Sequence, residues 1–233
     1  MARYTVIYSS FLERIKEVEL LRAKAKELEC SEDALSRGKE INALCRGSVV
    51  LLSAHIEAYI KELGEHTLDM IFKKAVCRSK LSHQFFYYIS KQNIEAIRST
   101  AQPASISEQM FKFLSKEVQF WEQKDPFKTP IPSEIFNAGF ANPTPEKIGS
   151  YLGRFGYSNF RTDVAHILKN ETDKTLRNLN LIVETRNLIA HGDLNASKTP
   201  AEIADMISGA KTFCRTSDQV FSKWCSDNLC SIR

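Results

Sequence analysis

Residues that interrupt helices are scarce in this sequence. Its 233 residues include only nine glycines and seven prolines. The prolines are confined to positions 103, 126–145 and 200, so long stretches contain nothing that would break a helix. This scarcity predicts an all-α fold, a bundle of helices with one long Pro-rich loop between about residues 125 and 145.

Long apolar runs and targeting segments are also missing. No run approaches the roughly 20 apolar residues that a helix needs to span a bilayer. The amino terminus lacks the basic, apolar and small-residue order of a signal peptide. We therefore expect a cytoplasmic protein with no membrane contact. Because 43% of the residues are hydrophobic, the chain can bury a real core, and we expect a single helical domain over residues 1–233.

Neither a strong charge nor paired cysteines mark this chain. A net charge of +4 permits a nucleic-acid partner without arguing for one, because the basic residues are spread out among acidic ones. The six cysteines show no Cys-x-x-Cys spacing, which favours free thiols packed as small apolar groups. A zinc site built from Cys214, Cys225 and Cys230 with a distant histidine is the alternative, and the spacings fit it poorly. We expect no metal and no cofactor.

Apolar residues at helical spacing predict the main elements. Four adjacent aromatics, Phe85 to Tyr88, must point in different directions on a helix, which favours core packing over base stacking for most of them. Ser31 resembles the cap of the second helix, which continues or bends after Gly64, and the last two helices are expected to form an antiparallel pair. The predicted helices cover residues 9–29, about 31–63, 81–98, 106–123, 145–154, 172–191 and 200–230.

An arginine and a histidine stand close together near the end of the helix predicted at 172–191. The segment reads Glu184-Thr-Arg186-Asn187-Leu-Ile-Ala-His191-Gly192, and the glycine can end the helix. Arginine supplies a fixed positive charge for phosphate, and histidine exchanges protons near neutral pH. At the carboxyl end of a helix the dipole also favours the protonated imidazole. RNA cleavage without a metal needs both groups.

Helix geometry limits what this segment can do by itself. Asn187 and His191 are four positions apart and share a face, whereas Arg186 lies about 140° around the axis from His191. Attack of the ribose 2′-hydroxyl on phosphate needs one group to remove a proton, another to protonate the leaving oxygen, and positive charge. One histidine per chain is not enough. A two-fold dimer would supply two histidines and two arginines in one cleft, so the segment predicts a homodimer.

A purely structural role remains open from the spacing. In that interpretation His191 hydrogen-bonds to terminal carbonyls of the helix, and Arg186 pairs with a nearby acid such as Glu184.

Three segments resemble a known family. The run Arg186-Asn-Leu-Ile-Ala-His191-Gly192 resembles the R-x4–6-H signature of the HEPN superfamily. Residues 51–63, LLSAHIEAYIKEL, and 142–148, NPTPEKI, followed by Arg154-Phe-Gly156, resemble its RiboL-PSP-type branch. The resemblance implies a HEPN-type helical bundle with additional helices that dimerises. In such a dimer the arginine and histidine of both protomers form a metal-independent ribonuclease site. Many relatives act in bacterial toxin–antitoxin or phage-defence systems.

The resemblance also implies residue roles. Arg186 would hold the scissile phosphate, His191 would act in proton transfer, and Asn187 would orient one of them or the substrate. Glu57 matches an acidic position on an earlier helix, and with Ser53 on the same face it could reach the site and orient Arg186. An ordinary ion pair is the alternative for Glu57. The other histidines match nothing in the signature and are expected to be structural or surface residues.

Three functions compete. The first is a dimeric endoribonuclease, a toxin or phage-defence effector that cleaves cellular or invading RNA. The second is a non-catalytic HEPN module that binds RNA, a nucleotide or a partner protein. The third is an antitoxin or scaffold subunit that co-purifies with a partner. We favour the first because nothing in a purely structural helix requires both Arg186 and His191. Any antitoxin or defence-system partner would be a separate chain.

Overall fold

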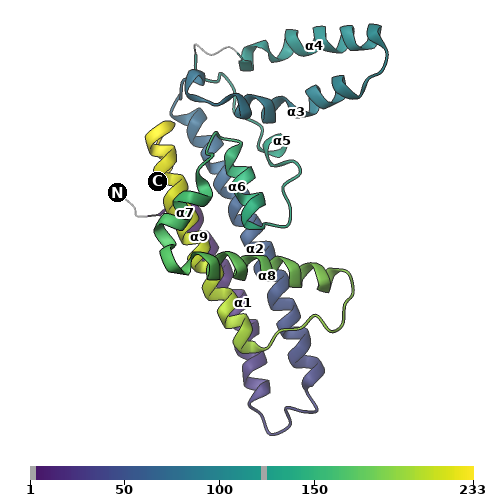
Figure 1. Cartoon of the computed structure of the whole chain (residues 1–233), viewed down its shortest axis with the longest axis vertical. Helices are drawn as coiled ribbons and strands as arrows, with labels where there is room; N and C mark the ends of the chain where they lie inside the picture. Colours follow the sequence, from purple (N-terminus) through teal and green to yellow (C-terminus); the bar gives the residue numbers. More distant parts are fainter. Residues whose placement is uncertain (1–3, 122–124) are drawn as a thin grey trace.

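The computed structural model describes residues 4–121 and 125–233, and the side chains of residues 116–121 are not among those described. Every regular element in these ranges is a helix (Figure 1), which confirms the predicted all-α fold. The elements are α1 (Val6–Glu29), α2 (Gly38–Lys73), η1 (Arg78–Lys80), α3 (His83–Ser99), α4 (Pro103–Trp121), α5 (Ser133–Asn137), α6 (Pro145–Gly153), α7 (Phe160–Leu168), η2 (Lys169–Glu171), α8 (Thr172–Ala190) and α9 (Pro200–Asn228).

The longest helix, α2, is the centre of the packing. It lies beside α1 and also contacts α8, α9 and α5 (Figure 1). The predicted apolar stripe is fully buried on it: Leu52, Ile56, Tyr59, Ile60 and Leu63. By length and mean hydropathy alone α2 meets the requirement for a membrane-spanning helix, contrary to the expectation from the sequence, but half of that stretch is buried inside the fold. These buried side chains form the core of the bundle.

Gly64 makes room on α2 for the Tyr151 side chain of α6. The helix neither ends nor breaks at this glycine, and it continues to Lys73. A Cβ atom at Gly64 would lie 2.0 Å from the hydroxyl oxygen of Tyr151, which is fully buried. That hydroxyl donates to the side-chain oxygen of Asn137, and the Asn137 amide donates to Glu65 Oε1 at 2.7 Å. A glycine is needed here because the tyrosine ring occupies the space of a side chain.

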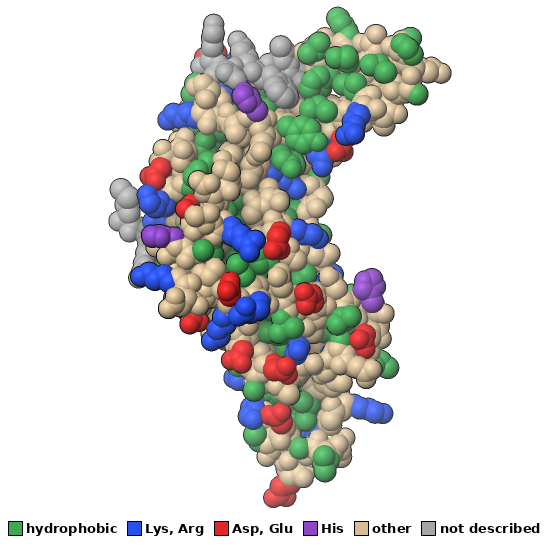
Figure 2. Space-filling view, in the orientation of Figure 1, with side chains coloured by type: hydrophobic (Ala, Val, Ile, Leu, Met, Phe, Trp, Pro, Cys, Tyr) green, Lys and Arg blue, Asp and Glu red, His purple; other side chains and the backbone are tan. Residues whose placement is uncertain are grey.

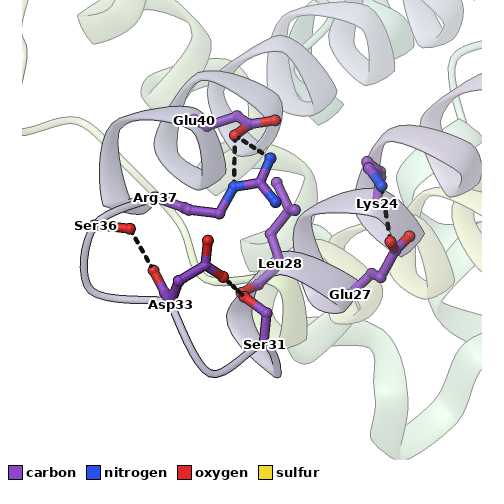
Figure 3. A network of polar contacts seen from close by, with 8 residues as sticks. All are labelled: Lys24, Glu27, Leu28, Ser31, Asp33, Ser36, Arg37 and Glu40. Atoms are coloured by element: carbon purple, nitrogen blue, oxygen red, sulfur yellow. Dashed lines mark hydrogen bonds and ion pairs between the residues drawn. The ribbon is translucent and has the colours of Figure 1, made fainter.

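The turn between α1 and α2 differs from the predicted one (Figure 3). Ser31 does not cap α2, because α2 begins only at Gly38. The Ser31 hydroxyl oxygen lies 2.7 Å from both Leu28 O and Asp33 Oδ1, so it closes the end of α1. Serine is common both after one helix and before the next, because its hydroxyl hydrogen-bonds nearby backbone groups in either place. The sequence alone did not show which of the two helices Ser31 would contact.

Two other predicted features need correction. The helix α8 lies across α9 and not antiparallel beside it (Figure 1). The Pro-rich segment expected to be an irregular loop contains the short helix α5, and it buries aromatic rings in the core, among them Phe127, Phe136 and Phe140. The short helix α7 was not predicted, and the last two residues of the helix expected at 106–123 lie outside the described ranges.

The helices α3 and α4 form an arm that projects from the bundle (Figure 1). At its base Phe85 and Phe86 are buried, whereas Tyr87 is 38% exposed, as expected for adjacent aromatics on one helix. Hydrophobic side chains lie on the surface of the arm (Figure 2), and they include the exposed Phe111 and Leu114 of α4.

All six cysteines are free thiols, as predicted. Cys45, Cys214 and Cys225 are buried and pack as small apolar groups. Within the described ranges, no three His, Cys, Asp or Glu side chains are grouped so that they could hold a metal ion.

We predict that Gly64→Ala destabilises the fold. The added methyl group would collide with the buried Tyr151 ring, and overpacking of this kind typically costs about 1–3 kcal/mol. Urea unfolding followed by circular dichroism measures the change. Gly47→Ala is the matched control, because Gly47 is an exposed position of the same helix where an added Cβ meets no atom within 4 Å. That substitution should stabilise by about 0.5–1 kcal/mol. Similar effects of the two substitutions would contradict the close approach of Tyr151.

Candidate functional site

The carboxyl end of α8 carries the arginine and histidine segment, as predicted. The helix ends at Ala190, and Gly192 adopts a left-handed φ of +83°. The Gly192 N–H donates to Ile189 O at 3.1 Å, and the Asp193 N–H donates to Leu188 O at 3.0 Å. These two bonds form a Schellman motif, in which glycine is favoured because it lacks a Cβ. The local sequence therefore ends the helix at Ala190, and His191 is its C-cap residue.

The His191 side chain points into solvent. It is exposed, and no residue within the described ranges hydrogen-bonds to its imidazole. Figure 2 shows a histidine and several hydrophobic side chains at the surface over this end of α8. The terminal carbonyls at Leu188 and Ile189 are satisfied by the backbone of Asp193 and Gly192. The purely structural interpretation of His191 is therefore unsupported.

Arg186 is half-buried and is held by two amide side chains. Its Nη1 donates to Asn142 Oδ1 at 3.0 Å and to Asn187 Oδ1 at 3.1 Å. It does not pair with the exposed Glu184 or with any other acid in the part of the chain that the structure describes. Because both acceptors are neutral, the guanidinium keeps its full positive charge for an anionic ligand.

Glu57 does not reach Arg186 directly, which differs from the expected contact. Its Oε2 accepts from the backbone N–H of Asn142 at 3.2 Å, and its Oε1 pairs with Lys61 Nζ at 2.7 Å. Glu57 thus forms an ordinary ion pair, as in the alternative interpretation, and it also holds the backbone of Asn142. Ser53, one turn before it, is buried.

Asn142 is the residue of the site that sequence reasoning missed. It adopts a left-handed φ of +54°, uncommon for any residue but glycine and tolerated best by asparagine and aspartate. Its carbonyl accepts from Thr144 N–H at 2.8 Å, and Thr144 then caps α6 by accepting from Lys147 N. The available signal was that Asn142 opens the 142–148 segment of the family resemblance, but nothing local connects it to Arg186.

Arg46 of α2 fixes the loop that follows His191. Its Nη1 donates to Asp193 O at 2.5 Å and to Ala196 O at 3.0 Å. These acceptors are also neutral, so a second half-buried arginine adds positive charge next to the end of α8.

Two leucines close to His191 in the sequence are exposed. Leu188 is 50% exposed and Leu194 is 80% exposed, on either side of His191 in the sequence. This end of α8 therefore presents apolar as well as polar side chains to solvent.

Comparison with known proteins places the chain in a family. The RiboL-PSP-HEPN family model matches residues 9–223, a range that includes Glu57, Asn142, Arg186 and His191. No match was found among curated proteins or among solved structures. Membership of a HEPN family points to an RNA-related role, often a nuclease. With nearly its whole length matched, and with the all-α architecture that this family has, the chain belongs to the RiboL-PSP-HEPN family.

Proposed function

We propose that this protein is a metal-independent endoribonuclease whose active site is completed by a second copy of the chain. It would act in the cytoplasm as a toxin or phage-defence effector on cellular or invading RNA. One observation carries the proposal. The guanidinium of Arg186 is fixed by two neutral oxygens at the helix end where His191 is exposed.

The proposed reaction uses these groups in named roles. Arg186 binds the scissile phosphate and stabilises the charge of the phosphorane. One His191 removes the proton of the ribose 2′-hydroxyl, whose oxygen attacks the adjacent phosphorus. His191 of the partner subunit donates a proton to the departing 5′-oxygen. The P–O5′ bond breaks, and the products are a 2′,3′-cyclic phosphate and a free 5′-hydroxyl. Asn187 orients Arg186 through its side-chain oxygen.

The second copy is needed because each chain supplies one histidine at this helix end. In a two-fold dimer the same surface patch meets itself, so the two α8 ends would lie together and the exposed Leu188 and Leu194 would be covered. An antitoxin or defence-system partner, encoded as a separate chain, would regulate such a site.

We predict that His191→Ala and Arg186→Ala each abolish cleavage. The test incubates labelled RNA with purified protein in EDTA and identifies the new 3′ ends, which should carry 2′,3′-cyclic phosphate. Loss of a general acid–base typically lowers the rate by about 100-fold or more. His166→Ala is the matched control, an exposed histidine outside the motif that should cleave normally.

Retained cleavage by His191→Ala would remove the assignment. If the native protein binds RNA without cutting it, and the variants bind as well as it does, the chain is instead a non-catalytic HEPN module.

A mixing experiment tests the composite site. Because each site would need His191 from both copies, a mixed dimer of native and His191→Ala chains should be inactive. At equal amounts and constant total protein, free exchange leaves about one quarter of the dimers fully native, so activity should fall to about a quarter. A site contained within one chain would leave about half. Co-purification of differently tagged copies confirms that subunits exchanged.

A further inference from the structure

We propose that Asn142 is a positioning residue, which fixes the Arg186 guanidinium in its phosphate-binding orientation and is itself held in place by Glu57. The inference rests on the proposed ribonuclease function. In this proposal, the loop between α5 and α6 positions the side-chain oxygen of Asn142 to accept a hydrogen bond from Arg186.

The hydrogen bonds occupy one end of the guanidinium and leave the other open. Both amide oxygens, Asn142 Oδ1 and Asn187 Oδ1, accept from the same nitrogen, Nη1. Nε and Nη2 of Arg186 have no hydrogen-bond acceptor within the described ranges. These two nitrogens form the parallel pair of donors with which arginine binds phosphate in bidentate fashion. Fixing Nη1 therefore orients the free edge without occupying it.

The chemistry of the acceptor explains why an amide stands at position 142. A carboxylate there would also accept from Arg186, but its negative charge would oppose the binding of phosphate. The amide oxygen directs the guanidinium and leaves its charge uncompensated. The one carboxylate in this chain of contacts, Glu57, bonds the backbone of Asn142 and is paired with Lys61.

The backbone at Asn142 is held in an uncommon conformation. Its φ of +54° is left-handed, and a conformation of this kind persists only where its surroundings enforce it. Glu57 accepts its N–H, and Thr144 N–H donates to its carbonyl. A left-handed residue whose side chain contacts the candidate catalytic arginine is a pattern found at functional positions.

The segment before Asn142 is anchored along its length. Arg154 donates to Phe136 O and to Ala138 O. The Phe140 ring is buried against Tyr151, with 4.7 Å between ring centroids, and Lys147 Nζ donates to Ala141 O at 3.2 Å. The Asn142 side chain is therefore presented from a rigid support, as precise orientation of Arg186 requires.

Two substitutions at position 142 separate the side chain from the backbone. Asn142→Gly tolerates the left-handed backbone and keeps the N–H that bonds Glu57, but it removes the acceptor for Arg186. Asn142→Asp keeps an acceptor and tolerates the same backbone. Both variants should unfold at a temperature close to that of the native protein.

We expect Asn142→Gly to lower kcat/KM for RNA on the order of 10- to 100-fold, the size of effect that misplacement of a catalytic group produces. Asn142→Asp should retain most of kcat and raise KM, because the oxygen still orients Arg186 while its charge opposes the phosphate. Native activity in the glycine variant would overturn the proposal. Equal loss of kcat in both variants would also overturn it, because the acceptor would then be irrelevant.

A second readout does not depend on cleavage. The Nε–H signal of Arg186 in a nitrogen-15 NMR spectrum, assigned by its loss in Arg186→Lys, reports motion of the guanidinium. The guanidinium should become markedly more mobile in Asn142→Gly and stay ordered in Asn142→Asp. Unchanged order in the glycine variant would overturn the positioning role even if the protein cleaves no RNA. Absence of cleavage by the native protein would count against the ribonuclease alone.

Discussion

The burial of α2 is the constraint on which the site depends. A 36-residue helix with so much apolar surface must be covered by elements from both halves of the chain, and α1, α8 and α9 all pack on it. Gly64 admits Tyr151, which brings the end of α5 and the segment after it onto the middle of α2. Glu57 then meets Asn142, while Arg46, three turns earlier, holds the loop after α8. One helix thus sets the position of the two parts of the site relative to each other.

Charge compensation distinguishes Arg186 from Arg14, Arg37 and Arg154. Arg14 and Arg37 pair with the carboxylates of Glu62 and Glu40, which compensate their charge. Arg154 bonds neutral carbonyls but is buried under the rings of Tyr88 and Tyr151, and desolvation lowers its pKa. Arg186 combines neutral acceptors with a position at the open end of a helix. A cation that is oriented but not compensated is what recognition of a phosphate diester requires.

Local signals predicted the part of the site that a single helix encodes. Gly192 and the apolar spacing of α8 are local features of the sequence, and the structure ends α8 just before this glycine, as predicted. The contact between Asn142 and Arg186 joins residues 44 positions apart, and the fold has to bring the segment before α6 onto α8 to form it. No periodicity or cap reports such a contact. Ser31 shows the same limit at shorter range, since its hydroxyl suits either end of a turn and only the fold selects one.

The two residues of the motif differ in how their positions are fixed. Arg186 is oriented within its own chain, because Asn187 and Asn142 both bond its Nη1. Asn187 shares a helix face with His191, yet its oxygen is engaged by the arginine, and the imidazole has no hydrogen-bond partner among the described residues. A group that transfers protons must be held within hydrogen-bonding distance of the reacting atoms. In the proposed reaction, the orientation of His191 would therefore come from RNA or from a second copy of the chain. An oriented cation and an exposed imidazole at the same helix end are what the proposed composite site would need from each copy.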